Sequence, residues 1–189
     1  HLGITRKTDK GIELRVHPTL SPEKRLIANV DGVMNAVLVQ GDAVGPTLYY
    51  GAGAGAEPTA SAVVADIIDT VRTIDAPLHH KVPLLGFQDD AMRDTPILSI
   101  DDVESAYYLR MVAEDHPGVL AEVSDTFAKN SISIEAVIQK EPATGENTVH
   151  LVMLTQKCVE SNVNHAIKAV EDLSSVHGDV VRIRMEHLD

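Results

Sequence analysis

Residues 115–120 read DHPGVL and separate a predicted strand from a predicted helix. Residues 106–113 before them favour a strand, whereas the apolar spacing from Leu120 to Ala128 is helical. Strand and helix patterns continue to alternate downstream. They predict strands over 134–139, 148–155 and 180–185, a loop over 142–147, a helix with apolar positions from 163 to 173, and a break at Gly178. The order β-α-β-β-α-β is typical of a ferredoxin-like domain, an antiparallel sheet with two helices on one face.

A second informative stretch, residues 51–67, reads GAGAGAEPTASAVVADI. Its alternating glycines follow a predicted hairpin, with strands at 36–40 and 47–50, and lead into a predicted helix over 59–74. Glycine lets the backbone approach a neighbour closely, and a helix start offers unpaired N–H groups with a partial positive charge. The stretch therefore predicts a place where an anionic or polar ligand meets the backbone.

Spacing alone leaves a simpler interpretation of these glycines open. The pattern is G-x-G-x-G, whereas the dinucleotide-binding fingerprint is G-x-G-x-x-G with an acidic residue about 20 positions on. The stretch is therefore not a Rossmann pyrophosphate loop, and a tight strand-to-helix turn explains the glycines equally well. The helix that follows has a broad apolar stripe, which predicts that it is largely buried. The stripe comprises Ala60, Val63, Val64, Ile67, Ile68, Val71 and Ile74.

The remaining segments carry weaker signals. A strand is predicted over 12–20 and a short helix over 21–28, while the proline-rich segment 77–100 is expected to connect two regions of different composition. The adjacent His79 and His80 do not predict a metal site, because side chains of neighbouring residues diverge and no cysteine or carboxylate has ligand spacing with them.

Composition limits the partners of the chain. The formal net charge of −12 over 189 residues disfavours nucleic acid and anionic membranes, both of which attract basic surfaces. The apolar runs are far shorter than a bilayer span. Cys158 is the only cysteine, so no intrachain disulfide can form, which fits a cytoplasmic location.

Residues 51–67, with 2–20 and 29–51, closely resemble homoserine dehydrogenases. The resemblance implies an enzyme that interconverts L-aspartate 4-semialdehyde and L-homoserine with NAD(P)(H), in threonine and methionine biosynthesis. It places the glycine loop beside the cofactor, with Gly53 first, then Gly51, Gly55 and Glu57. It also places the catalytic lysine, the homoserine-binding acids and the nucleotide domain upstream of Leu2. We therefore expect a C-terminal part of the enzyme that has no catalytic residue, binds no cofactor and is inactive alone.

The DHPGVL motif resembles the D-x-P-G-x-L of ACT domains, and NSISI at 130–134 also matches. This resemblance implies that a small amino acid, with threonine favoured, binds between paired units, so that the protein is at least a dimer. Backbone donors at 117–120 would bind its carboxylate, and Asp115 or Asn130 would accept from its ammonium group. The residues implied to bind the effector are Asp115, His116, Pro117, Gly118, Val119, Leu120, Asn130 and Ile132. A purely dimerising role stays open.

The predicted fold class is α/β (α+β), in three segments. Residues 1–76 would form part of a catalytic-domain sheet with helices, 77–103 a connector, and 104–189 a ferredoxin-like ACT domain. A stand-alone amino-acid-binding or dimerisation module without catalysis is the alternative. The coding sequence upstream would discriminate between the two, because the enzyme requires a strand, a G-x-G-x-x-G loop and a lysine there.

Overall fold

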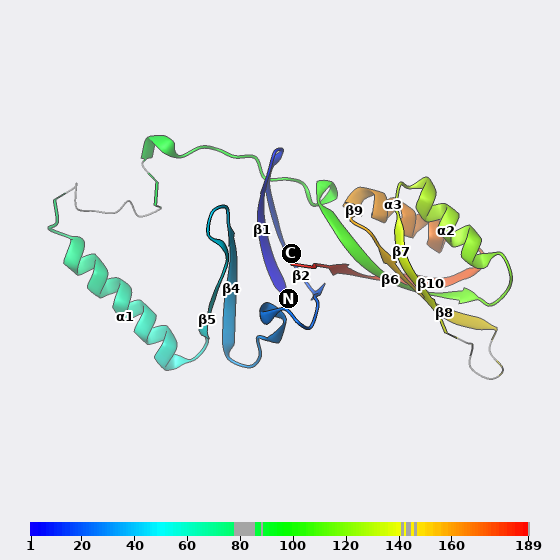
Figure 1. The fold of residues 1–189 in the computed structure, drawn as a ribbon, viewed down its shortest axis with the longest axis horizontal. Coiled ribbons are helices and arrows are strands. Elements are labelled where there is room, and N and C mark those ends of the chain that lie inside the picture. The colour runs from blue at the N-terminus through cyan, green and yellow to red at the C-terminus, as the bar shows by residue number, and fades with distance from the viewer. Residues whose placement is uncertain (78–85, 88, 141, 143–144, 146, 189) are drawn as a thin grey trace. The chain divides into compact units, whose positions relative to one another are not determined.

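The α+β class predicted from the sequence is confirmed (Figure 1). The computed structural model describes residues 1–77, 86–87, 89–140, 142, 145 and 147–188. Contacts divide the chain into two units, one formed by residues 1–22 with 95–189 and the other by residues 23–94. The boundaries at 76 and 103 were predicted from family resemblance and not from contacts. They therefore stay a prediction.

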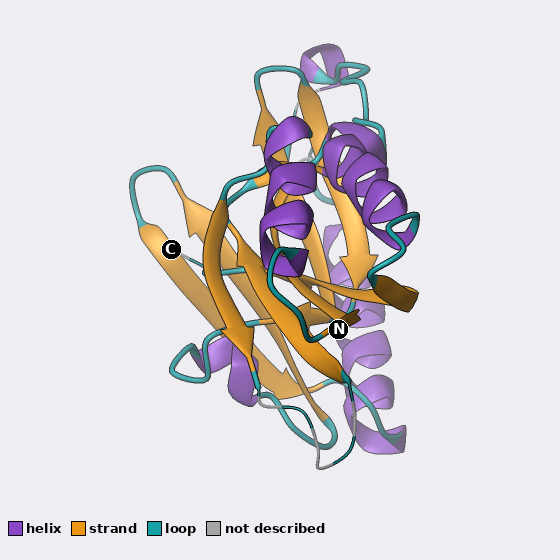
Figure 2. Ribbon diagram, turned by 90° about the vertical axis from the view of Figure 1, so that its right-hand side faces the viewer, coloured by secondary structure: helices purple, strands orange, loops and turns teal. Residues whose placement is uncertain are grey.

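The larger unit contains the predicted β-α-β-β-α-β order. Four strands form an antiparallel sheet in the order β10-β6-β8-β7. Both helices lie on one face of it (Figures 1 and 2). The elements are β6 (Glu104–Glu114), α2 (Val119–Lys129), β7 (Ile134–Gln139), β8 (Thr148–Thr155), β9 (Cys158–Val159), α3 (Glu160–Glu171) and β10 (Val176–Met185).

The core of this unit lies between the sheet and the two helices. Alternate side chains of β6 point into it, because successive residues of a strand face opposite sides of a sheet. The helices contribute residues three or four positions apart, which is the spacing of one helix face. The buried members include Tyr107, Leu109, Met111, Val123, Phe127, Leu151, Met153, Val163, Ala166 and Val170. Aliphatic residues thus form most of the core of a chain that has few aromatics.

The N-terminal segment adds a hairpin and a strand to the same unit. Strand β1 (Leu2–Thr8), which the sequence analysis did not predict, pairs antiparallel with β2 (Gly11–His17). Strand β3 (Thr19–Leu20) pairs parallel with the end of β10 and so extends the sheet. The predicted strand over 12–20 is therefore two strands separated by Pro18, which has no N–H to donate.

Gly11 shows why the start of β2 needs glycine. The amide of Ile12 donates to the carbonyl of Pro96 at 2.8 Å, and the amide of Leu98 donates to the carbonyl of Ile12 at 2.9 Å. A Cβ added to Gly11 would lie 2.3 Å from the Pro96 carbonyl oxygen, and its φ of +143° is one that L side chains rarely adopt. The hairpin and the segment before β6 therefore approach at backbone distance.

The described residues of the smaller unit form a hairpin, one long helix and two short 3₁₀ turns. Strands β4 (Met34–Gly41) and β5 (Gly45–Ala52) pair antiparallel, as predicted. The glycine loop leads from β5 to α1 (Ala56–Thr73), which confirms the predicted helix. The 3₁₀ turns are η1 (Leu26–Asn29) and η3 (Asp89–Ala91). The short helix predicted over 21–28 is therefore wrong, because only residues 26–28 of that range are helical, in η1.

The prediction that α1 is largely buried is wrong. None of its residues is buried, and Val63, Ile67 and Val71 are each more than half exposed. The stripe has the expected helical spacing, but periodicity reports only that a face is apolar and not what covers it. No helix in the described ranges is long and apolar enough to cross a membrane.

Candidate functional site

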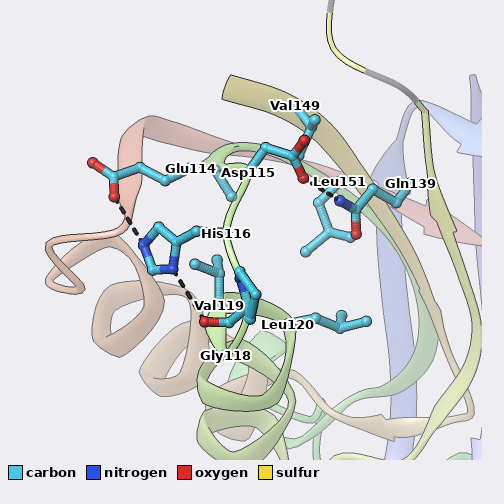
Figure 3. Close-up of a pocket in the computed structure, with 11 residues that line it drawn as sticks. Glu114, Asp115, His116, Gly118, Val119, Leu120, Gln139, Val149 and Leu151 are labelled. Carbon is cyan, nitrogen blue, oxygen red and sulfur yellow. Dashed lines mark hydrogen bonds and ion pairs between the residues drawn. The ribbon is translucent and has the colours of Figure 1, made fainter. Parts of the chain in front are cut away.

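A pocket of about 340 Å³ opens where β6 ends and α2 begins (Figure 3). Its walls come from the end of β6, the loop before α2, the start of α2, the end of β7 and the first half of β8. The lining residues are Ala113, Glu114, Asp115, His116, Pro117, Gly118, Val119, Leu120, Gln139, Val149 and Leu151. The structure thus brings together all six residues of the DHPGVL motif.

The loop is held by backbone hydrogen bonds. The amide of Glu114 donates to the carbonyl of Ser175 at 2.9 Å, and the amide of Asp115 donates to that of Asn147 at 2.8 Å. Gly118 is the N-cap of α2, with a φ of +105° that favours glycine. A Cβ at Gly118 would meet no atom within 4 Å, so the space beside this backbone is open.

No side chain caps α2, which begins at Val119, and Asp115 does not serve as its cap. Asp115 instead accepts from Gln139 Nε2 at 3.1 Å, which ties the loop to the end of β7. No side chain accepts from the first amides of α2. The amide of Val119 donates to the carbonyl of His116 at 3.5 Å, and that of Glu122 donates to the carbonyl of Gly118 at 3.0 Å. The amides of Leu120 and Ala121 are therefore the ones available to a ligand.

Glu114 and His116 interact at the edge of the pocket. His116 Nε2 lies 3.0 Å from Glu114 Oε2, and His116 Nδ1 lies 3.2 Å from the Pro117 carbonyl oxygen (Figure 3). These two acceptors raise the pKa of His116, the Pro117 carbonyl most. His177 Nε2, on β10, lies 3.4 Å from the other oxygen of Glu114.

The opposite side of the pocket is apolar. Val119 and Leu120 come from α2, and Val149 and Leu151 come from β8. A concave site with a few converging polar groups and an apolar wall is typical of small-molecule binding. The arrangement suits a small ligand that has a charged end and a short apolar side chain.

Two of the predicted effector residues lie elsewhere. Asn130 is the C-cap of α2, and its Nδ2 donates to the carbonyl of Thr126 at 2.8 Å. Ile132 is 4% exposed and belongs to the core. Neither lines the pocket. Two polar lining residues were not predicted from the sequence. Glu114 directly precedes the motif, whereas Gln139 lies near it only because of the position of β7 in the sheet.

The glycine loop of the smaller unit is exposed throughout. Gly55 is the N-cap of α1 with a φ of +123°, and Glu57 lies in the first turn. A Cβ on Gly51 would meet no atom within 4 Å, whereas a Cβ on Gly53 would lie 2.6 Å from Asn35 Nδ2. Close packing against Asn35 therefore accounts for Gly53, while Gly51 has open space beside it.

Other candidate chemistry is limited. Among the residues that the structure describes, no group of three or more His, Cys, Asp or Glu side chains is arranged to hold a metal ion. His79 and His80 lie outside the described residues. Cys158 is buried as a free thiol, and burial raises its pKa. A thiol of this kind is unreactive.

Two family models match separate stretches of the chain. Residues 1–68 match the family model described as homoserine dehydrogenase, and residues 107–174 match that of the ACT domain. The two matches lie one after the other along the chain, without overlap. Both resemblances inferred from the sequence are thereby confirmed.

Curated relatives and a solved structure extend the match along the chain. A homoserine dehydrogenase of Pseudomonas aeruginosa is 56% identical over 189 residues, which are 100% of this chain and 44% of the relative. One of Neisseria gonorrhoeae is 55% identical over 99% of this chain and 43% of the relative. The crystal structure of a homoserine dehydrogenase from Thiobacillus denitrificans is 59% identical with a TM-score of 0.89, over 99% of this chain and 42% of that one. The chain thus spans less than half the length of these relatives.

Proposed function

We propose that this chain is part of an NAD(P)-dependent homoserine dehydrogenase whose ACT domain senses an amino acid. The enzyme would interconvert L-aspartate 4-semialdehyde and L-homoserine in threonine and methionine biosynthesis, in the cytoplasm. The match over residues 1–68 supports the enzyme class. The observation that carries the sensing role is the pocket of about 340 Å³ at Gly118, where backbone donors, a carboxylate and an apolar wall converge.

The pocket has a complementary group for each part of an amino acid. The first amides of α2 lie at the positive end of the helix dipole and suit the carboxylate. Asp115, held by Gln139, provides an acceptor for the ammonium group. Leu120 and Val149 suit a short side chain such as that of threonine, which we favour as effector. For Asn130 and Ile132 only the family resemblance supports a contact with the effector.

The glycine loop fits a position beside a nicotinamide cofactor. Its backbone is exposed from Gly51 to Gly55 and leads into the N-terminus of α1, where N–H groups suit polar or anionic parts of a ligand. Glu57 in the first turn would accept from ligand hydroxyl or amide groups. When bound, NAD(P) supplies hydride transfer. We assign this chain a positioning role toward the cofactor and no catalytic residue.

Pairing of two ACT domains would fit the free edge of the sheet. Among the described residues, β7 pairs with β8 on one side only, and its Val137 and Ile138 are 39% and 50% exposed. An exposed apolar edge strand is a template for pairing with another chain. We therefore propose a homo-oligomer that is at least a dimer.

Two measurements test the proposal. Isothermal titration calorimetry of the oligomeric chain with threonine, isoleucine and methionine is expected to give saturable heat with at least one of them. Absence of heat with all three would refute the sensing role. We expect no homoserine-dependent reduction of NAD(P) by this chain alone. Turnover would refute the proposal that the catalytic residues lie upstream of Leu2.

The alternative is a stand-alone amino-acid-binding or dimerisation module. It is favoured by one observation, namely that every lining residue of the pocket belongs to the larger unit. The two proposals differ in the coding sequence upstream. A strand, a G-x-G-x-x-G loop and a lysine there would support the enzyme, and their absence would support the module.

A further inference from the structure

His116 stands between two groups that can only accept hydrogen bonds. Its Nδ1 lies 3.2 Å from the Pro117 carbonyl oxygen, and its Nε2 lies 3.0 Å from Glu114 Oε2 (Figure 3). A neutral imidazole carries one N–H and can satisfy only one of these acceptors. Both contacts are hydrogen bonds only when the ring carries two N–H groups. The geometry therefore selects the imidazolium form.

His17, in the same unit, is held in the opposite state. Its Nε2 lies 3.1 Å from Arg15 Nη1, which can only donate, and its Nδ1 lies 3.0 Å from the Pro18 carbonyl oxygen. That ring therefore accepts at Nε2 and donates at Nδ1, which is a neutral tautomer. His17 and His116 therefore differ in their partners, because His17 has a donor at one ring nitrogen whereas His116 has acceptors at both.

We infer that His116 sets the charge of the pocket, so that its protonation admits the carboxylate of the bound amino acid. The inference deepens the proposed sensing role and rests on it. Protonated His116 compensates Glu114, which also lines the pocket. Neutral His116 leaves that carboxylate exposed to the ligand, and like charges repel.

The charged groups around His116 give the expected sign. Glu114 comes from the end of β6, Asp115 from the loop, Glu122 from α2 and His177 from β10. Asp115 accepts from Gln139, and Glu122 accepts from Ser175 Oγ at 3.0 Å, so Glu114 is the carboxylate that His116 compensates. Neutral His116 leaves the charge of Glu114 facing the pocket. Affinity for an anionic group therefore falls as the pH rises through the titration of His116.

The exposure of His116 and Glu114 limits how strongly the affinity depends on pH. The side chains of His116 and Glu114 are 55% and 41% exposed, so solvent screens their interaction. We expect the dissociation constant for L-threonine to rise about threefold between about pH 6 and about pH 8. The His116→Gln variant keeps a side chain that can donate to Glu114 but cannot titrate. It is expected to bind about threefold more weakly than wild type at about pH 6, with little change at about pH 8.

The test is calorimetry of the full chain with L-threonine, and with isoleucine and methionine, at both pH values. His165→Gln on the exposed side of α3 is the matched control and should follow wild type. Nitrogen-edited NMR of the imidazole rings gives a readout without ligand, because His116 should show two N–H groups at about pH 6.

The outcomes separate the two levels of the proposal. No heat with any of the three amino acids at either pH overturns the sensing role itself, and this inference with it. Binding by wild type with the same affinity at both pH values overturns the role of His116 and leaves sensing intact. A His116→Gln variant that keeps the wild-type pH dependence has the same consequence. Loss of that dependence in His116→Gln but not in His165→Gln supports the inference.

Discussion

Replacement of Arg15 by methionine is expected to loosen the N-terminal hairpin from the sheet that carries the pocket. The Arg15 side chain is 1% exposed and lies between two carboxylates. It donates to Glu13 Oε1 at 2.5 Å, to Glu186 Oε1, and to Ser105 Oγ at 3.4 Å. Glu13 and Ser105 lie on β2 and β6, and Glu186 follows β10 directly. One guanidinium thus joins three parts of the unit.

The magnitude follows from what the substitution leaves behind. Glu13 and Glu186 are 5% and 7% exposed, and without Arg15 they become two buried carboxylates close together. Removing one partner of a buried ion pair costs about 3–5 kcal/mol. Arg6 lies 3.6 Å from Glu13 and 3.5 Å from Glu186, and as a half-exposed cation it compensates part of the loss. We therefore expect about 3 kcal/mol, the lower end of that range.

Two measurements quantify this change. Urea unfolding followed by circular dichroism gives the loss of stability, and hydrogen exchange gives its location in β1, β2 and β3. The triple variant Arg15→Met, Glu13→Gln, Glu186→Gln should recover most of the loss, because neutral groups need no counter-ion. Arg110→Met, at an exposed position of β6, is the control and should change stability by less than about 0.5 kcal/mol. Wild-type exchange rates in Arg15→Met would refute the reasoning.

Three further predictions concern Glu160, Gly118 and the glycine loop. Burial alone would raise the pKa of Glu160, but hydrogen bonds from Arg184 and Tyr107 lower it below 4.5. Wild type should therefore lose stability as the pH falls through this lowered pKa. In Glu160→Gln, the urea midpoint should depend less on pH in the acid range. Gly118→Ala places a side chain at a φ of +105°, which should cost about 1–2 kcal/mol in thermal unfolding and weaken effector binding in calorimetry. Gly53→Ala pushes against Asn35 and should raise hydrogen exchange in β4, whereas Gly51→Ala has open space and should not.

The second half of the chain was predictable because its signals are local. The predicted strands over 134–139 and 148–155 coincide with β7 and β8, and Gly178, with a φ of +72°, interrupts the register of β10 against β6 where a break was expected. Strand alternation, helical spacing and turn residues all act over a few positions. The six residues of the DHPGVL motif are contiguous, so finding the motif was enough to find most of the pocket.

The features that were missed depend on residues far apart in sequence. Arg15 and Glu186 are separated by 171 positions, and neither reads as buried when taken alone. Strand β1 has basic residues on an exposed hairpin and pairs fully with β2, so its hydrophobic signal is weak. The burial of α1 was predicted from the apolar stripe of the helix itself. Burial also requires another element that packs on this stripe, and the spacing of apolar residues does not identify one.

Strands β6 and β10 connect the pocket to the N-terminal segment within one hydrogen-bonded sheet. At one end, Glu114 and His177 stand at the edge of the pocket, and at the other, Ser105 and Glu186 contact Arg15. Between them the two strands pair directly, except at the bulge beside His177. A ligand shifts an equilibrium only by its differential affinity for two arrangements, so sensing requires an element with two discrete positions. Charge or register, rather than continuous apolar packing, fixes the geometry at the bulge, at the ion cluster of Arg15 and at Glu160, which binds Tyr107 of β6 and Arg184 of β10.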